Sequence, residues 1–303
     1  MPPDPDLPFD PEDIPYFFDN WCSLPWSPWV PFSATKEEFR QIPREPGVYR
    51  IRPAGKNFLM YVGETGRTLH RRLNDLRMEL RNRDFMPWSD LHAESPALWA
   101  WTDAEHYTYE CSAAPLDTAV SGRKGMKSFL LYQYRHVRGR STFCNFGRFH
   151  PRYRKSTNRK KGLRGGRLAE GHKDNPAGFP SMEPLEVSGK PGESTWMGLE
   201  WSAWEVLVPE NAREVPAFAG VYLIADAGSH EIVFIGQSAD VTERLLDHCG
   251  RTGDERSLAF SYQIVGKSVL PHNLRELEND LIGNYFKNFR KAPEFQFRNT
   301  TGL

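Results

Sequence analysis

Residues 42–51, IPREPGVYRI, return in altered form as VPAFAGVYLI at residues 215–224. Tyr-Val-Gly begins twelve residues after Tyr49, at Tyr61, and Phe-Ile-Gly begins twelve residues after Tyr222, at Phe234. An arginine follows ten residues beyond the aromatic residue of each tripeptide, and these two arginines are Arg71 and Arg244. Equal spacing at successive intervals predicts that one small structural unit is folded twice along the chain.

A further pair of similar stretches extends the repeat towards its end. MKSFLLYQYR and LENDLIGNYF each predict a last helix, and aligning the two pairs Lys127 with Glu278. Eighteen residues later, Asn145 stands opposite Gln296. The repeat therefore runs from the glycine before each first tyrosine to these two amide side chains.

Local patterns predict the elements of each copy. GVYRIRP and FLMYVGE are short apolar runs around a Gly-Lys-Asn turn, and GVYLIAD and EIVFIGQ repeat that pattern, so each pair is expected to form a β-hairpin. A helix is expected to begin near each arginine. The fold class is therefore predicted to be α/β, with two tandem modules that are each a small mixed β-sheet flanked by helices.

The first copy is longer than the second between its arginine and its last helix. The first copy spans 56 residues from Arg71 to Lys127 and the second spans 34 from Arg244 to Glu278, which leaves about 22 extra residues in the first. Alternating aromatic residues in the stretch 96–112 predict that this insertion forms an extra strand or a recognition loop.

The N-terminal 35 residues differ in composition from the rest of the chain. They hold six acidic residues, no Lys or Arg, nine prolines and three tryptophans. Proline removes backbone donors and fixes φ, so a regular helix is excluded there. Two interpretations stay open, namely an extended arm anchored on a domain by its tryptophans, and a partly disordered acidic tail.

A strongly basic stretch follows the first copy. Residues 148–167 carry nine cationic side chains and no acidic one, which favours contact with nucleic-acid phosphates over a merely solvated linker. The cationic residues are Arg148, Arg152, Arg154, Lys155, Arg159, Lys160, Lys161, Arg164 and Arg167. The predicted domains are an arm (1–35), a first module (36–150), a basic and then Pro/Gly-rich connection that contacts DNA (151–200), and a second module (201–303).

Composition excludes several classes of protein. The chain has 39 basic and 39 acidic residues and no run that approaches the roughly 20 apolar residues of a membrane helix. Its N-terminus lacks the layout of a signal peptide. The four cysteines are widely scattered, which argues against a zinc site or a disulfide framework and favours a reducing cytoplasm.

The complete set of spaced residues resembles the GIY-YIG nuclease superfamily. The resemblance covers about 110 residues of the first copy and about 100 of the second. It implies that a glutamate on the last helix holds one divalent cation, Mg²⁺ or Mn²⁺. It also implies that the first tyrosine contacts the attacking water and that the arginine faces the scissile phosphate. A hard carboxylate suits Mg²⁺, which takes few protein ligands and keeps most of its waters.

The second copy is the better match at the implied metal position. Its implied catalytic and metal residues are Tyr222, Arg244, His248 and Glu278. It departs from the pattern at Phe234, which lacks a hydroxyl, and at Gln296 where the family has Asn, a role for which Asn299 is available. Glu276 and Asp280 are rivals of Glu278 for the metal.

The first copy departs at the metal position itself. Its implied site residues are Tyr49, Tyr61, Arg71 and Asn145, with Arg72 as a rival of Arg71. Asp75 stands where the second copy has His248, and Lys127 stands where a carboxylate is needed. Either this copy is a natural non-cutting module that holds DNA, or Lys127 replaces a glutamate in a silenced cutter.

The expected function is metal-dependent hydrolysis of phosphodiester bonds in double-stranded DNA. One module would cut while the other binds DNA, as in a restriction or phage-defence endonuclease. Two alternatives remain, a non-cleaving tandem clamp on DNA and a nuclease that repairs or resolves branched DNA. Because one active centre cuts one strand per visit, double-strand cleavage would require a homodimer or repositioning.

Overall fold

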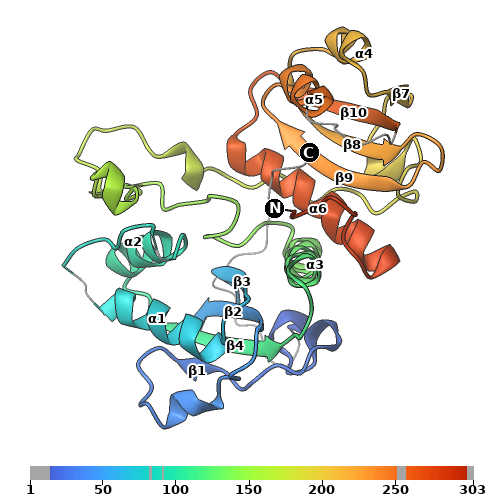
Figure 1. Ribbon diagram of the computed structural model, residues 1–303. Helices are drawn as coiled ribbons and strands as arrows, with labels where there is room; N and C mark the ends of the chain where they lie inside the picture. Colours follow the sequence, from blue (N-terminus) through green and yellow to red (C-terminus); the bar gives the residue numbers. More distant parts are fainter. Residues whose placement is uncertain (1–13, 82–83, 91, 251–256, 299–303) are drawn as a thin grey trace. The chain divides into compact units, whose positions relative to one another are not determined.

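The computed structural model describes residues 14–81, 84–90, 92–250 and 257–298. The chain divides into two compact units (Figure 1). Unit 1 comprises Met1–Ala119 and Ser141–Pro180, and unit 2 comprises Val120–Arg140 and Ser181–Leu303. The chain leaves unit 1 for one helix of unit 2 and then returns, so the compact units differ from the predicted division at residues 35, 150 and 200.

Unit 1 is built on a four-stranded sheet in the order β1-β4-β2-β3. The strands are β1 (Val30–Pro31), β2 (Gly47–Pro53), β3 (Tyr61–Thr65) and β4 (Tyr109–Pro115), and the helices are α1 (Leu69–Arg81) and α2 (Ser95–Glu105). Leu69, Leu73 and Leu76 recur at helical spacing and are buried in the core that α1 shares with the sheet.

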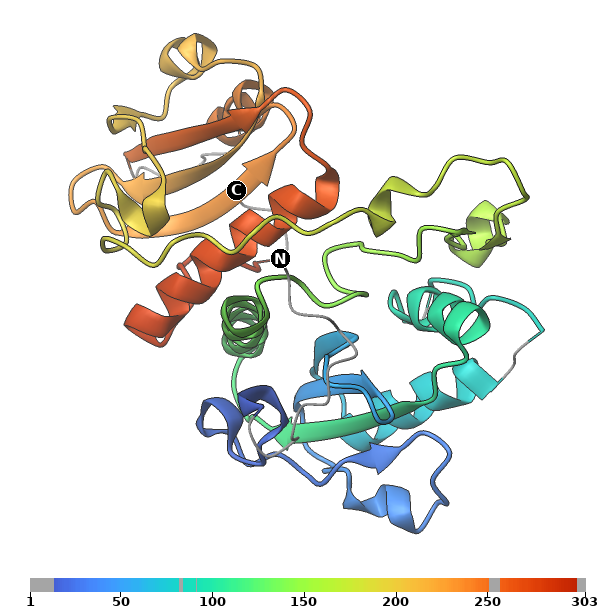
Figure 2. The ribbon, with the colours of Figure 1, turned by 180° about the vertical axis from the view of Figure 1, so that it is seen from behind.

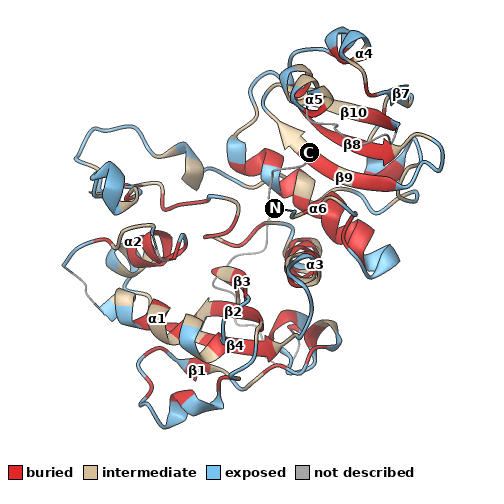
Figure 3. Cartoon of the chain, in the orientation of Figure 1, coloured by how far each residue is buried: buried red, intermediate tan, exposed pale blue. Residues whose placement is uncertain are grey.

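Unit 2 repeats this sheet in the order β7-β10-β8-β9. The strands are β7 (Glu205–Val206), β8 (Ala219–Asp226), β9 (Ile232–Ser238) and β10 (Leu258–Gly266), and the helices are α3 (Val120–Arg138), α4 (Pro209–Glu214), α5 (Val241–Cys249) and α6 (Pro271–Phe289). Most residues of β8 and β9 are buried (Figure 3), and α6 packs against both strands.

The two sheets share their order of strands and the register at their centre. Tyr49 is paired with Gly63, and Tyr222 is paired with Gly236. A Cβ on Gly63 would lie 2.2 Å from Cζ of Tyr49, and one on Gly236 would lie 2.4 Å from Cζ of Tyr222. Each tyrosine ring therefore lies across a position that only glycine can occupy.

The prediction of an α/β fold is confirmed, but the prediction of mixed sheets is wrong. Every strand pairing among the described residues is antiparallel. The reason is the connectivity, because β2–β3 and β8–β9 are hairpins and the third long strand of each unit returns beside the first.

Helix α3 follows β4 in the chain but packs in unit 2. Helices α3 and α6 lie side by side in both views (Figures 1 and 2). A Cβ on Gly125, near the start of α3, would meet the Phe286 ring near the end of α6, so the two helices run antiparallel. The buried Arg135 bridges them, with Nε 2.8 Å from Oδ1 of Asp280 and Nη1 3.5 Å from Glu276. Both predicted rivals of Glu278 are therefore committed to this ion-pair network.

A tryptophan motif extends the repeat upstream of the tyrosines. Trp-x-x-Leu-x-Trp-Ser-x-Trp begins at Trp21 in the presumed arm and again at Trp196 in the presumed connection. Trp26 donates through Nε1 to the Trp21 carbonyl at 2.9 Å, and Trp201 donates to the Trp196 carbonyl at 3.0 Å. The rings of each pair stack, with centroids 5.8 and 6.1 Å apart. These segments are thus part of the two folded copies.

The described part of the N-terminal arm packs onto unit 1, as the first of its two interpretations expected. The guanidinium of Arg50 lies 4.2 Å from the ring centroid of Trp26 and 4.7 Å from that of Trp29, and Nη1 donates to the Tyr16 carbonyl at 2.6 Å. Residues 1–13, which hold most of the acidic side chains of the arm, lie outside the described residues.

The helix after the hairpin begins one residue earlier in the second copy. Leu69 donates its amide to the Glu45 carbonyl at 2.9 Å, and Val241 donates to the Phe218 carbonyl at 3.1 Å. Because Glu45 and Phe218 each stand two residues before the glycine of Gly-Val-Tyr, Leu69 and Val241 are equivalent. The spacing in the sequence pairs Arg71 with Arg244, but these backbone contacts pair Arg72 with Arg244. The other residues of α1 and α5 shift by one position in the same way.

The insertion of the first copy is helical where an extra strand or loop was expected. Ser95–Glu105 form α2, which the Pro96 at its first turn favours. Tyr109–Pro115 form β4, which pairs with β2 and is the counterpart of β10. The alternating aromatics therefore belong partly to a helix and partly to a strand that both copies possess.

The basic stretch forms a hairpin within unit 1. Strands β5 (Tyr153–Arg154) and β6 (Gly166–Arg167) pair with each other, and a turn of 3-10 helix at Arg159–Lys161 lies between them. Tyr153 anchors the hairpin, because its buried hydroxyl donates to Oδ2 of Asp103 at 2.5 Å. The stretch is therefore a structured ribbon and not a linker. Among the described residues, no helix combines the length and apolar character that a bilayer span requires.

Candidate active site

The second copy gathers a tyrosine, a histidine and an aromatic ring beside its central strands. Tyr222 on β8 is buried, and its hydroxyl lies 2.9 Å from Nε2 of His248 on α5. The ring of Phe234 on β9 packs 6.1 Å from Tyr222 and 5.4 Å from His248 between centroids. Phe234 therefore completes an aromatic wall at this place and contributes no hydroxyl.

Two charged side chains complete this cluster. The side chain of Arg244, one turn before His248 on α5, hydrogen-bonds with Tyr222. Burial raises the pKa of Tyr222 to about 12, while Arg244 lowers it and the charge of Glu278 raises it further. Tyr222 is therefore protonated at neutral pH and electrostatically coupled to both the arginine and the glutamate.

Glu278 on α6 is a half-buried side chain. Burial raises its pKa to about 7, even though the charges of Arg275 and Arg244 both act to lower it. A divalent cation beside this carboxylate would oppose the effect of burial. Tyr222 thus contacts His248, and the charges of Arg244 and Glu278 both act on Tyr222. We call these side chains the Tyr222 cluster: Tyr222, Arg244, His248 and Glu278.

The amide side chains at the end of each copy hydrogen-bond to the backbone of the second strand of the hairpin. Asn145 accepts a hydrogen bond from the Val62 amide at 2.9 Å and donates to the Val62 carbonyl at 2.9 Å. Gln296 accepts one from the Ile235 amide at 3.0 Å. The pairing of Asn145 with Gln296 from spacing agrees with these contacts, which give both residues a supporting role. Asn299 lies outside the described residues.

The first copy has a different set of neighbours around its tyrosine. The Tyr49 hydroxyl donates to Oε1 of Glu94 at 2.7 Å, and Arg72 donates to the same oxygen through Nη2 at 2.8 Å. Arg72 also donates through Nε to the Tyr49 hydroxyl at 3.2 Å. The three side chains form a closed triangle, which we call the Tyr49 cluster, and in it the carboxylate of Glu94 neutralises the arginine.

The prediction of Arg71 as the site arginine is wrong. Arg71 is exposed, whereas Arg72 contacts Tyr49. The error follows from the one-residue offset between α1 and α5, which makes Arg72 the counterpart of Arg244. The same offset matches His248 with the buried Leu76 and not with Asp75, which pairs at the surface with Arg67 at 3.3 Å.

Two polar residues of the insertion were not predicted. Glu94 precedes α2, and His92 stands two residues earlier with its Nδ1 4.0 Å from Oε1 of Glu94. Both are almost fully buried, and burial together with the charge of Arg72 lowers the pKa of His92 to about 4. Tyr61 packs beside Tyr49 at 6.0 Å between ring centroids. Because the second copy lacks an insertion, the repeat gave no signal for either residue.

Lys127 occupies the same helical position as Glu278. Lys127 is the eighth residue of α3 and Glu278 the eighth of α6, and both helices have 19 residues. Their predicted pairing therefore agrees with the helix bounds. Helix α3 is part of unit 2, whereas the Tyr49 cluster lies in unit 1.

The basic hairpin is only partly free to contact a ligand. Arg148 is buried, Arg152 pairs with Asp174 at 2.9 Å, and the backbone amide of Arg159 donates to Asp90 at 2.9 Å. The remaining cationic residues are exposed, namely Arg154, Lys155, Lys160, Lys161, Arg164 and Arg167. The predicted continuous basic stripe is therefore reduced to these side chains.

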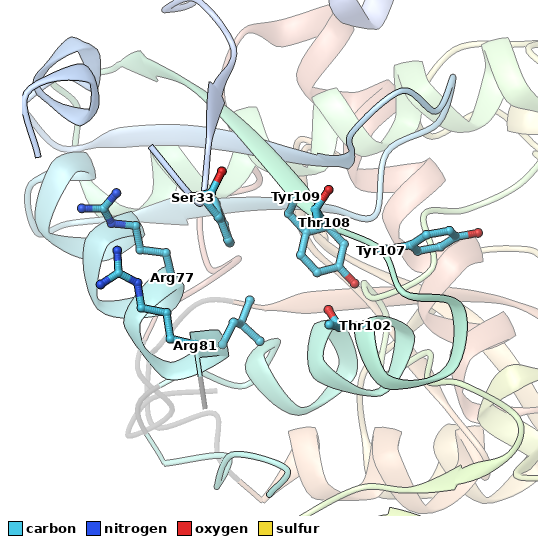
Figure 4. A pocket seen from close by; sticks show the side chains of 9 residues that line it. Ser33, Arg77, Arg81, Thr102, Tyr107, Thr108 and Tyr109 are labelled. Carbon is cyan, nitrogen blue, oxygen red and sulfur yellow. The ribbon is translucent and has the colours of Figure 1, made fainter. Parts of the chain in front are cut away.

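A cavity of about 370 Å³ lies in unit 1 away from the Tyr49 cluster. Arg77 and Arg81 stand at one end of it, and Tyr107 and Tyr109 line the rest (Figure 4). Arg77 donates through Nη1 to the Ala34 carbonyl at 2.9 Å, so its guanidinium is committed to the fold. This cavity shares no lining residue with either cluster.

The described residues contain no group of three or more His, Cys, Asp or Glu side chains arranged to hold a metal ion. A cation at Glu278 would therefore take one protein carboxylate and complete its shell with water and substrate oxygens, which is the manner in which Mg²⁺ is commonly bound. Scans of the chain against protein-family models and against curated proteins found no match.

Proposed function

We propose that this protein is a divalent-metal-dependent DNA endonuclease whose second copy cuts the phosphodiester bond. The observation that supports the proposal is the surroundings of Tyr222, which contacts His248 and is influenced by the charges of Arg244 and Glu278. Phosphodiester hydrolysis requires positive charge near the phosphate oxygens, a proton acceptor and a carboxylate for a cation. The cluster offers one side chain for each of these requirements.

Glu278 would hold the cation, Mg²⁺ or Mn²⁺. When bound, this ion would neutralise charge that develops on the phosphate and lower the pKa of a coordinated water. Arg244 would bind a phosphate oxygen. Tyr222 is protonated, so it accepts a proton from water only by passing its own proton to Nε2 of His248, which lies 2.9 Å from its hydroxyl. The pair thus forms a short relay for one proton.

The first copy is proposed not to cut. Its arginine and tyrosine are both held by Glu94, whose carboxylate neutralises the charge of Arg72. The helix position of the metal ligand is Lys127, an ammonium that repels a divalent cation. We infer that this copy contributes DNA contacts and structural support, whether Lys127 is natural or replaces a glutamate.

Double-stranded DNA is the proposed substrate, and restriction or phage defence is the narrower proposal for its use. The exposed cations of the β5–β6 hairpin support a polyanionic partner. None of the four cysteines, all of which are described, forms a disulfide, and action in the reducing cytoplasm is proposed accordingly. A homodimer is proposed where both strands are cut.

Cleavage of supercoiled plasmid with Mg²⁺ tests the proposal. Glu278→Gln preserves the size of the side chain and removes its charge, so we expect a loss of about 100-fold or more in cleavage rate. Glu231→Gln is the matched control, because Glu231 is an exposed glutamate of unit 2 that pairs with Lys291, and it should cut at the wild-type rate.

Four other outcomes would contradict parts of the proposal. Full activity of Glu278→Gln would exclude the Tyr222 cluster as the cutting centre. Cleavage that appears only in Lys127→Glu would move the chemistry to the first copy. Salt-sensitive DNA binding without cleavage by the wild-type protein would identify a clamp, and a strong preference for branched substrates would identify a repair or resolving nuclease.

A further inference from the structure

We propose that a second cavity of unit 1, at the base of the basic hairpin, binds an unstacked nucleobase of DNA. This inference rests on the proposed function, because it assumes that the ligand of the hairpin is DNA. The cavity measures about 200 Å³. It is lined by Met78, Glu79, Phe85, Pro87, Trp88, Asp90, Arg159 and Arg164.

Aromatic surface is exposed in this cavity to an extent that the fold does not require. The side chain of Phe85 is 60% exposed, which makes it the most exposed aromatic residue among the described part of the chain. Trp88 lies beside it and is partly exposed. Aromatic side chains that face solvent next to cations are the usual platform on which unpaired bases stack.

Arg164 of the hairpin lies against the two aromatic rings. The guanidinium of Arg164 lies 4.5 Å from the ring centroid of Trp88 and 5.5 Å from that of Phe85, and Nη1 donates to the Met86 carbonyl at 3.1 Å. Arg164 is therefore held as a flat, positively charged surface. A planar base can stack on it as well as on the aromatic rings.

The charges around the cavity favour a base inside it and phosphates outside it. Glu79 and Asp90 line the cavity and bring two negative charges that repel a phosphate. Asp90 accepts the Arg159 backbone amide and Glu79 accepts the Ser95 hydroxyl, and the acceptor sites that remain on the two carboxylates can bind the amino group of a base. Lys160 and Lys161 stand exposed on the hairpin outside the cavity, where phosphates are attracted. A base inside and its backbone outside satisfy both sets of charges.

The site is rigid enough to select such a ligand. Asp90 accepts the Arg159 backbone amide with both carboxylate oxygens, at 2.9 and 3.1 Å, and thereby ties the aromatic segment to the hairpin. Ser89 donates its amide to the Thr157 carbonyl at 3.2 Å. These contacts hold the aromatic segment and the hairpin together before any ligand arrives, so little ordering is needed on binding.

Fluorescence anisotropy with short labelled duplexes tests the inference. One duplex is fully paired, and the other carries a single unpaired cytosine. Phe85→Ala is expected to weaken binding of the duplex with the unpaired base by about fivefold or more, and to change binding of the paired duplex by less than about twofold. The side chain is exposed, so the variant should fold normally.

Controls separate this inference from the proposed function. Phe289→Ala removes another exposed aromatic side chain and should change neither affinity. A paired substitution, Lys160→Gln with Lys161→Gln, should weaken both duplexes. If Phe85→Ala affects both duplexes equally or neither, the base site is excluded while DNA binding stands. If the wild-type protein binds neither duplex, the proposed DNA substrate itself is excluded.

A second readout locates the base directly. With 5-iodouracil as the unpaired base, photocrosslinking is expected to attach the DNA to the segment that contains Phe85 and Trp88. Crosslinks confined to other segments of the chain would overturn the inference.

Discussion

Each copy has a carboxyl group that interacts with its tyrosine and its arginine, and the two carboxyl groups differ in how the protein compensates their charge. Glu94 accepts hydrogen bonds from Tyr49 and from Arg72, so its charge is matched by an adjacent cation. Glu278 is half-buried, and burial raises its pKa to about 7 although the charges of Arg275 and Arg244 lower it. A carboxylate that the protein alone does not stabilise is the one suited to bind an added cation.

The raised pKa of Glu278 predicts a pH dependence of stability. Its ordinary pKa is 4.5 and burial raises it to about 7, so the folded state binds this proton more tightly than the unfolded state does. In metal-free protein, the free energy of unfolding should therefore fall as pH rises from about 4.5 to 7, by on the order of 2 kcal/mol from this group. Urea denaturation at pH 5 and pH 8 measures the change.

Metal and substitution provide the controls for this effect. Mg²⁺ binds the deprotonated carboxylate, so it should restore stability at pH 8 and have little effect at pH 5. In Glu278→Gln both the loss with pH and the rescue by Mg²⁺ should shrink. An unchanged response to pH and Mg²⁺ in this variant would show that another group titrates.

Single residues also mark the limit of prediction from sequence. The ten-residue spacing predicts Arg71 only if the loop before the helix has the same length in both copies. This loop is one residue longer in the first copy, so Arg72 and not Arg71 contacts Tyr49. Glu94 and His92 belong to an insertion without a counterpart, so no internal comparison could reveal them. Tyr222, Arg244, His248 and Glu278 were predictable because the second copy keeps the spacing of the resemblance.

At the scale of elements, the hairpins and last helices were predictable and the tryptophan segments were not. Apolar runs around Gly-Lys-Asn identify β2–β3, those around Ala-Gly-Ser-His identify β8–β9, and helical spacing of leucines identifies α1. The Trp-x-x-Leu-x-Trp-Ser-x-Trp motif is visible in the sequence on both sides, but its proline-rich surroundings in the first copy resemble a linker. The serine of each motif indicates a structural role. Ser27 accepts a hydrogen bond from a backbone amide of β4, and Ser202 accepts one from a backbone amide of β10, both at 3.1 Å.

This motif is predicted to be a structural clasp. Trp201 is buried, stacks on Trp196 and donates to its carbonyl, so Trp201→Ala should destabilise the protein by about 3 kcal/mol. Trp204 lies at the end of the same motif and is only partly buried, so Trp204→Ala should cost less than about half of that amount. Thermal and urea denaturation compare the two variants, and equal losses of stability would exclude the clasp.

At the scale of the whole molecule, one chain carries two versions of the same sheet with different polar centres. In the second version burial raises the pKa of the Glu278 carboxyl to about 7, whereas in the first version Arg72 and Glu94 form an internal ion pair. The asymmetry predicts one cutting centre per chain. Supercoiled plasmid should therefore be converted first to the nicked circle, and only later to the linear form.

The route from the nicked to the linear form distinguishes one chain from two. If two chains meet at a site, the rate of linearisation should rise more steeply than in proportion to protein concentration, whereas the rate of nicking should be proportional to it. Adding excess Glu278→Gln protein should then suppress linearisation, because mixed pairs cut one strand only, and nicking by the wild-type protein should persist. Linear product that forms as fast as the first nick, and in proportion to protein concentration, would require a second cutting centre in the same chain. Within the described residues, the Tyr49 cluster is the place that the repeat offers for such a centre, so Glu94 would then have to release Arg72 when DNA binds.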